Sequence, residues 1–484
     1  MMANLFSNIN LSKSRSASSI SLPVVVGLVR IADLMLLGLA GSLSITLITW
    51  THGSALQGPV ESAAWVGALA TNLGLAREGA YTQAALLSGI TQVRLLTKPL
   101  LLGVACLIAC LFVLYHGKLP FRSWPLAWAG IGAVLIAAFR FPLAHVMRRW
   151  SIGGRLARKI AIVGVSSFSQ EFIERLRDDP DAYHILGIYD DRRSRVPSTQ
   201  AGITIQGTVA DLVLRSREEK IDVIVIALPL SAIERIKAIM DQLSSTIADI
   251  VLTTDLAGLH FSRAQFNGIG LNPVVTVREA PLKDWQALKK AALDKTIGVL
   301  ALLIFAPVML LTAGLIKLDS PGPVLFRQPR MGFNNQTFLC YKFRSMRQDM
   351  TDLLADKQTT RDDPRVTRVG RIIRKLSIDE LPQIFNVLNG TMSLVGPRPH
   401  AVNTKAADRL FTEVVQQYAT RHRVKPGITG WAQINGWRGE TSTVEQIERR
   451  VACDLFYIEN WSLRFDLKIM VKTVLREVYS HNAF

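Results

Sequence analysis

Long runs of apolar residues constrain the fold of this chain more than any other feature of its sequence. The run from Thr296 to Ile316 contains 21 residues and no charge. Other apolar runs lie at 22–50, 100–115 and 125–139, with a shorter, glycine-containing run at 63–76. A helix of ~20 apolar residues is long enough to cross the hydrocarbon core of a bilayer. We therefore expect a membrane protein whose N-terminal domain, residues 1–150, is a helical bundle of about four spans.

The formal net charge of +18 is concentrated at the two ends of the chain. Residues 1–150 carry +8 and residues 317–484 carry +9, whereas residues 151–316 carry only +1. The first loop of the bundle has no Lys or Arg and its exit is strongly basic, so the positive-inside rule places both ends of the bundle in the cytoplasm. We expect no nucleic-acid partner, because no recognition motif accompanies the charge.

Strand-like and helix-like segments alternate in the region that we assign to residues 151–283. The predicted strands lie at 158–165, 184–190, 221–228 and 248–254, and the predicted helices at 168–177, 208–219 and 231–245. This alternation is typical of a parallel sheet with helices on its faces, here a Rossmann-like α/β domain. The first turn holds one glycine, Gly164, where a dinucleotide-binding fingerprint has three. A structural or regulatory domain is therefore favoured over a dinucleotide-binding one.

The apolar run around Pro307 has two possible topologies. Pro307 lies at its centre, where it removes a backbone donor and crowds the carbonyl of Leu303, which favours a kink. Basic residues such as Lys295 and Lys317 flank the run on both sides, so both ends favour the cytoplasm. A helix at about 291–318 that enters the membrane, bends and returns satisfies both observations, and a full span is the alternative.

Two adjacent carboxylates, Asp379 and Glu380, follow a basic segment that ends at Lys375. At the start of a predicted helix the helix dipole favours negative charge, and neighbouring cations keep carboxylates ionised. An ionised Asp can attack phosphorus, and a neighbouring Glu can bind a divalent cation. The alternative is a purely structural capping box formed by Ser377 and Glu380.

Two stiff, basic turns follow the carboxylate pair. Residues 396–399 read Gly-Pro-Arg-Pro and hold Arg398 between two prolines, which suits bidentate contact with a phosphate. Residues 425–431 read Lys-Pro-Gly-Ile-Thr-Gly-Trp. Each segment has the alternative of being only a tight turn.

Several segments resemble a known family over about residues 284–484. They are PGPVLFRQPRMG at 321–332, YKFRSM at 341–346, SIDELPQIFNVLNGTMSLVGPRP at 377–399 and KPGITGWAQIN at 425–435. Together they closely resemble the bacterial polyprenyl-phosphate sugar-1-phosphate transferases, and the order of domains resembles the large members. Three further segments are most similar to the undecaprenyl-phosphate glucose phosphotransferases of exopolysaccharide pathways: PHAV at 399–402, GWRGET at 436–441 and DLFYIENWSL at 454–463.

The resemblance implies a reaction in which a UDP-sugar gives its sugar-1-phosphate to undecaprenyl phosphate and UMP leaves. It implies that Asp379 is the nucleophile and forms a covalent phosphosugar, and that Glu380 is associated with Mg²⁺. It places phosphate groups against Arg374 and Arg398. It also implies a mixed, mainly α-helical catalytic domain, residues 284–484, monotopic on the cytoplasmic face of the inner membrane, with a re-entrant helix broken at Pro307.

One departure and two alternatives accompany this resemblance. The residue before the central Pro is often Ser in the family but is Ala306 here, so no hydroxyl at that position can satisfy the freed backbone carbonyl. Glucose is the expected sugar, with galactose as the alternative. Membrane lipids are expected partners, and a homo-oligomer is left open. A different class of function would be a membrane-anchored, nucleotide-sensing scaffold without catalysis.

Overall fold

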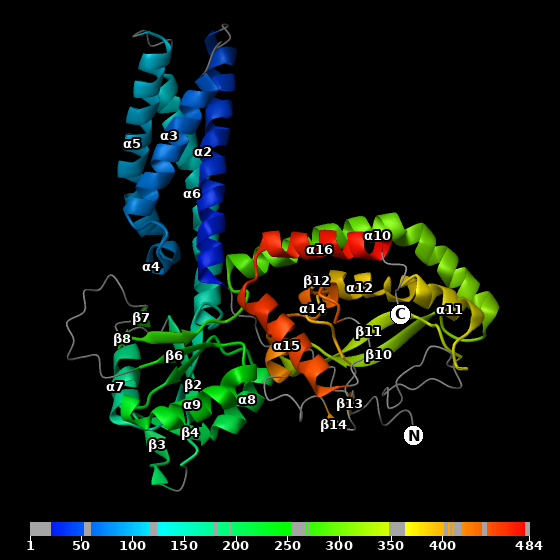
Figure 1. Ribbon diagram of the computed structural model, residues 1–484. Helices are drawn as coiled ribbons and strands as arrows, with labels where there is room; N and C mark the ends of the chain where they lie inside the picture. The colour runs from blue at the N-terminus through cyan, green and yellow to red at the C-terminus, as the bar shows by residue number, and fades with distance from the viewer. Residues whose placement is uncertain are drawn as a thin grey trace. The chain divides into compact units, whose positions relative to one another are not determined.

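The computed structural model describes most of the chain in two compact units. The described residues are 21–52, 60–116, 123–177, 182–192, 195–253, 268–269, 272–347, 364–400, 405–406, 409–410, 418–437 and 443–479. Residues 17–157 belong to one unit, and the residues from Arg158 onward belong to the other (Figure 1). Each unit has hydrophobic clusters of its own.

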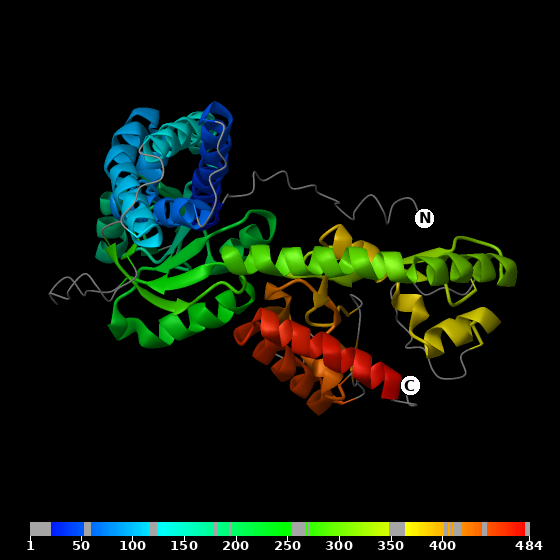
Figure 2. The ribbon, with the colours of Figure 1, turned by 90° about the horizontal axis from the view of Figure 1, so that it is seen from above.

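The first unit is a bundle of helices, which Figure 2 shows almost end-on. Its helices are α2 (Leu22–His52), α3 (Val60–Arg77), α4 (Gln83–Leu87), α5 (Gly89–Leu114) and α6 (Trp124–Ile152). Helices α2, α5 and α6 are long and apolar enough to cross a membrane. The weaker run at 63–76 forms α3, which has 18 residues and is not among these helices. The expectation of about four N-terminal spans therefore stays a prediction.

A buried ion pair joins two helices of this bundle. Arg140 of α6 donates to Asp33 of α2 at 2.5 and 3.2 Å, and both side chains are at most 3% exposed. The hydroxyl of Tyr81 also donates to Asp33, at 2.9 Å. Because a charge inside a membrane is costly unless it is paired, this network fixes how α2 and α6 pack together.

The second unit begins with a seven-stranded sheet in the order β3-β4-β2-β1-β5-β6-β9. Its strands are β1 (Arg158–Val163), β2 (Tyr183–Tyr189), β3 (Thr199–Gln200), β4 (Ile203–Gly207), β5 (Val223–Ile226), β6 (Asp249–Leu252) and β9 (Val275–Arg278). The associated helices are α7 (Ser167–Leu176), α8 (Val209–Glu218) and α9 (Ile233–Gln242). Strands β4, β2, β1, β5 and β6 are parallel neighbours. The predicted alternation of four strands and three helices is confirmed, and the sheet has three further strands.

The rest of the second unit is mainly helical, as expected. Its helices are α10 (Trp285–Asp319), α11 (Arg368–Lys375), α12 (Gln383–Leu388), α14 (Trp431–Ile434), α15 (Val444–Glu459) and α16 (Leu463–Tyr479). Its strands are β10 (Leu325–Met331) and β11 (Thr337–Phe343), β12 (Ser393–Val395) and β15 (Gly427–Thr429), and β13 (Lys405–Ala406) and β14 (Arg409–Leu410). Strands β7 (Gly268–Ile269) and β8 (Asn272–Pro273) form a separate pair. Short 3-10 turns include η3 (Leu243–Ser245), η4 (Phe333–Asn335), η6 (Ile378–Glu380) and η7 (Tyr418–Arg423).

Helix α10 is a single helix of 35 residues with Pro307 inside it. It is the fourth helix long and apolar enough to cross a membrane, and Figure 1 shows it changing direction along its length. Both ends contact the same unit: Lys290 donates to the carbonyl of Val395 at 2.9 Å, and Asp319 accepts from the backbone N–H of Val369 at 3.1 Å. Large apolar side chains in between are exposed, among them Leu303, Ile304, Leu310 and Leu311.

Candidate active site

The Asp379–Glu380 pair lies in the short turn η6, between α11 and α12. Helix α11 ends at Lys375, and Ser377 then takes a left-handed backbone conformation with φ of 55°, which reverses the chain. The side chain of Ser377 makes no capping hydrogen bond there, and α12 begins only after Pro382. The capping-box alternative for Ser377 and Glu380 is therefore wrong, because the carboxylate of Glu380 has other partners.

Apolar side chains hold this turn against helix α10. Ile378 and Leu381 flank the two carboxylates and pack on a cluster that contains Met309 and Ile316 of α10. Phe343, at the end of β11, belongs to the same cluster. The carboxylates are thus fixed directly beside the second half of the apolar helix.

Glu380 is clamped by two cations from other elements. Lys342 of β11 donates to its Oε1 at 2.7 Å. Arg398 donates to Oε1 at 2.6 Å and to Oε2 at 3.1 Å, a two-pronged contact that fixes both side chains. Burial raises the pKa of Glu380, but the charges and hydrogen bonds of Arg398 and Lys342 outweigh it and hold the pKa well below its usual range. Glu380 is therefore ionised, as the sequence predicted.

Asp379 has a different environment from its neighbour. Within the part of the chain that the structure describes, no group makes a hydrogen bond or ion pair with its carboxylate. Burial raises the pKa of Asp379 and the charge of Glu380 raises it further, while Lys342, Arg374 and Arg398 lower it without reversing the shift. The net shift of the pKa is therefore upward for Asp379 and downward for Glu380. A carboxylate of raised pKa is more basic, and is the better nucleophile once it is ionised.

The two arginines predicted to bind phosphate differ in their contacts with the carboxylate pair. Arg398 is in direct contact with the carboxylate pair through Glu380. Arg374, on α11, is close enough for its charge to act on Asp379, although none of the described groups forms a hydrogen bond or ion pair with its guanidinium. The structure thus brings both arginines near the carboxylates.

The two stiff turns noted in the sequence form one structure. Strands β12 and β15 are parallel, and the N–H of Gly396 donates to the carbonyl of Thr429 at 2.9 Å. The N–H of Gly427 donates back to the carbonyl of Pro397 at 3.0 Å. A Cβ on either glycine would overlap the backbone of the other turn, so only glycine permits this approach. The second turn therefore supports the first, which carries Arg398.

Two basic residues near the carboxylates had no role assigned from the sequence. Lys342 lies in the YKFRSM segment on the hairpin strand β11, and Arg330 lies on the opposing strand β10. Arg330 donates to the carbonyl of Pro399 at 2.6 Å. In the sequence each of these residues is only a cation in a short strand, and that pattern does not reveal which group the cation contacts.

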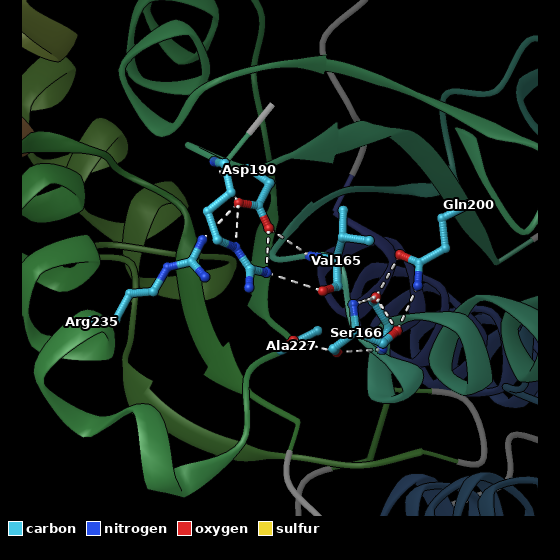
Figure 3. A network of polar contacts seen from close by, with 8 residues as sticks. Val165, Ser166, Asp190, Gln200, Ala227 and Arg235 are labelled. Atoms are coloured by element: carbon cyan, nitrogen blue, oxygen red, sulfur yellow. Dashed lines mark hydrogen bonds and ion pairs between the residues drawn. The ribbon is translucent and has the colours of Figure 1, made fainter. Parts of the chain in front are cut away.

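A dinucleotide would bind at the carboxyl ends of the parallel strands, so the polar groups there test whether this domain is a dinucleotide-binding one. Asp190, directly after β2, is completely buried and accepts hydrogen bonds from the backbone of Val165 at 2.9 Å and from Arg235 at 2.7 Å (Figure 3). Burial raises the pKa of Asp190, but hydrogen bonds from Arg192, Val165 and Arg235 outweigh it and hold the pKa below its usual range. Ser166 and Ser169 cap the first turn of α7 themselves. These groups are satisfied inside the domain, which favours the structural interpretation.

Two family models match different parts of the chain. A family model described as bacterial sugar transferase matches residues 285–480, and one described as CoA-binding domain matches residues 77–254. The chain is 42% identical, over 81% of its length and 73% of the relative, to an undecaprenyl-phosphate glucose phosphotransferase of Komagataeibacter xylinus.

Two further relatives are named for the transfer of different sugars. The chain is 40% identical, over 68% of its length and 69% of the relative, to a UDP-glucose:undecaprenyl-phosphate glucose-1-phosphate transferase of Escherichia coli (strain K12). The chain is 47% identical, over 40% of its length and 43% of the relative, to a UDP-N-acetylgalactosamine-undecaprenyl-phosphate N-acetylgalactosaminephosphotransferase of Aeromonas hydrophila.

Proposed function

The chain belongs to the bacterial sugar transferase family, and on that premise we propose that it transfers glucose-1-phosphate from UDP-glucose to undecaprenyl phosphate and releases UMP. This would be the first membrane step of exopolysaccharide synthesis. One observation carries the proposal: the carboxylate of Asp379, which pairs with none of the described groups, lies beside Glu380, which is clamped by Lys342 and Arg398. On this proposal Asp379 is the nucleophile, and the neighbouring cations bind phosphate oxygens.

The proposed reaction has two steps, and Asp379 is the nucleophile of the first step and the leaving group of the second. Its carboxylate oxygen attacks the phosphorus bonded to the sugar, and the bond from that phosphorus to the bridging oxygen breaks. UMP leaves with the electron pair, and an acyl phosphate joins Asp379 to the sugar. An oxygen of undecaprenyl phosphate then attacks the same phosphorus, and the carboxylate of Asp379 is released unchanged.

The cations around the pair stabilise charge on the transferred phosphate. We expect Arg374, whose guanidinium pairs with none of the described groups, to bind a phosphate oxygen, and Arg398 is held in place by Glu380. Preorganised donors of this kind lower the barrier because they need not reorient during the reaction. The two arginines therefore position the pyrophosphate for attack by Asp379.

Mg²⁺ fits this site as a partner of the substrate. No cluster of three or more His, Cys, Asp or Glu side chains occurs among the described residues, so no all-protein cage is present there. Mg²⁺ in phosphoryl transfer is usually held by one or two carboxylates together with substrate phosphates, and Asp379 and Glu380 supply such carboxylates. When bound, the ion would neutralise pyrophosphate charge.

The placement in the membrane follows from helix α10. Lys290 near its start and Asp319 at its end contact the same catalytic unit, and the apolar side chains between them are exposed. A helix that crossed the bilayer would separate those two ends by its full thickness. We infer that α10 enters and leaves on the cytoplasmic face of the inner membrane, where UDP-sugars and the lipid phosphate meet.

Cysteine labelling tests this topology. In a background without the four native cysteines, Lys289→Cys and Lys317→Cys place thiols at exposed positions on either side of the apolar run. Both are expected to react with a membrane-impermeant maleimide only when the cytoplasmic face is open. Gln57→Cys, in the loop expected on the other side, is the control with the opposite pattern. Labelling of Lys289→Cys and Lys317→Cys from opposite sides would establish a full span.

A UMP-release assay tests the reaction and the sugar. We expect UMP release from UDP-glucose, dependent on undecaprenyl phosphate for repeated turnover, with at least about a tenfold lower kcat/KM for UDP-galactose and UDP-N-acetylgalactosamine. A preference for UDP-galactose would transfer the proposal to that sugar. No UMP release with any UDP-sugar would instead favour the non-catalytic scaffold.

A further inference from the structure

A buried arginine outside the carboxylate pair contacts the loop that carries Arg398. Arg421 of η7 is 1% exposed. Its Nη2 donates to the backbone carbonyl of Arg398 at 2.8 Å, and its Nη1 lies 2.7 Å from Nδ1 of His400. One planar guanidinium therefore contacts both residues that flank Pro399, which limits the movement of that loop.

The loop depends on donors from elsewhere in the fold. The carbonyls of residues 398–400 each accept one hydrogen bond, in order from Arg421, from Arg330 at 2.6 Å and from the backbone N–H of Met331 at 3.2 Å. The two prolines of the loop have no N–H, so their backbones accept hydrogen bonds but cannot donate any. The position of the Arg398 backbone is thus set largely by donors that do not belong to its loop.

Arg421 is held in turn by a buried carboxylate. Its Nη2 lies 2.7 Å from Oδ2 of Asp454 on α15, and Asp454 is 2% exposed. Removing one member of a buried ion pair leaves the other charge buried without a partner, which destabilises the fold. The pair ties the direction of the Arg421 guanidinium to helix α15.

We propose that Arg421, oriented by Asp454, is a positioning residue for the transfer reaction: it fixes the backbone of Arg398 so that the Arg398 guanidinium reaches Glu380 and the substrate phosphate. The inference rests on the proposed function, which assigns Arg398 to the phosphate. A displacement of about 1 Å in a phosphate ligand can lower a rate by about 100-fold, so the support of the loop matters to the reaction.

A double-mutant cycle tests the inference on the full-length enzyme in detergent. Arg421→Gln is expected to lower kcat/KM for UMP release from UDP-glucose by about 10- to 100-fold. In an Arg398→Gln background the same substitution is expected to cost less than about twofold, because the residue through which it acts has already been removed. Arg449→Gln, an exposed arginine on α15 whose side chain is 59% accessible, is the matched control and is expected to keep full activity.

The outcomes separate the inference from the function on which it rests. Equal fold-losses for Arg421→Gln in the two backgrounds would mean that Arg421 acts independently of Arg398, which would overturn the inference. Full activity of Arg398→Gln alone would refute the phosphate role of Arg398 and, with it, the premise. If Arg421→Gln does not fold, the same cycle with Arg421→Lys, which keeps a cation beside Asp454, decides between the same outcomes.

Discussion

An Asp379→Asn variant is expected to release UMP from UDP-glucose at least about 1000-fold more slowly than the wild type, because an amide cannot replace a carboxylate nucleophile. The substitution keeps the size of the side chain. It removes no hydrogen bond within the described part of the structure, so the clamp on Glu380 by Lys342 and Arg398 should persist. The loss of rate would then reflect the chemistry of Asp379.

The covalent step can be observed directly. With UDP-glucose labelled on its β-phosphate and no lipid acceptor, the wild-type protein should retain label and release a burst of UMP close to one equivalent. Asp379→Asn should show neither. Asp241→Asn, on an exposed part of α9, is the control and should behave like the wild type. Full UMP release by Asp379→Asn in the presence of undecaprenyl phosphate would exclude Asp379 as the nucleophile.

The sequence predicted the centre of the α/β sheet well because burial imposes a strong pattern on it. Strand β5 (Val223–Ile226) is buried at every position and lies between amphipathic helices, so its apolar run is easily recognised. Strand β3 has two residues, and β9 alternates between exposed and partly buried positions. Edge strands of this kind are defined by their hydrogen-bonded neighbours, which a single sequence does not reveal.

The candidate site was predictable where one short segment carries the chemistry. Asp379 and Glu380 are adjacent, and Arg398 lies between two prolines, so each could be selected locally. The pairing of Glu380 with Lys342 spans 38 residues and depends on where the β10–β11 hairpin packs. The contact of Arg421 with Arg398 depends likewise on a buried ion pair with α15. The capping-box interpretation failed for a local reason, because the left-handed conformation of Ser377 is not visible in the sequence.

Mg²⁺ dependence is the second large effect that we expect, and Glu380 is the residue that links it to the protein. Chelation with EDTA should reduce UMP release by at least about 100-fold, because the pyrophosphate would keep its full negative charge during attack. In Glu380→Gln the carboxylate charge is lost while Lys342 and Arg398 remain, so the site becomes more positive and less able to hold a cation.

We therefore expect Glu380→Gln to need about 10- to 100-fold more Mg²⁺ for half-maximal activity. A titration of UMP release against Mg²⁺ concentration measures this shift for the wild type and the variant. Glu445→Gln is the matched control, because Glu445 also pairs with an arginine but its side chain is 70% accessible and lies on the surface of α15. An unchanged titration midpoint in Glu380→Gln would show that Glu380 is not a metal ligand. Its role would then be to hold Arg398. Undiminished activity in EDTA would refute the Mg²⁺ requirement itself.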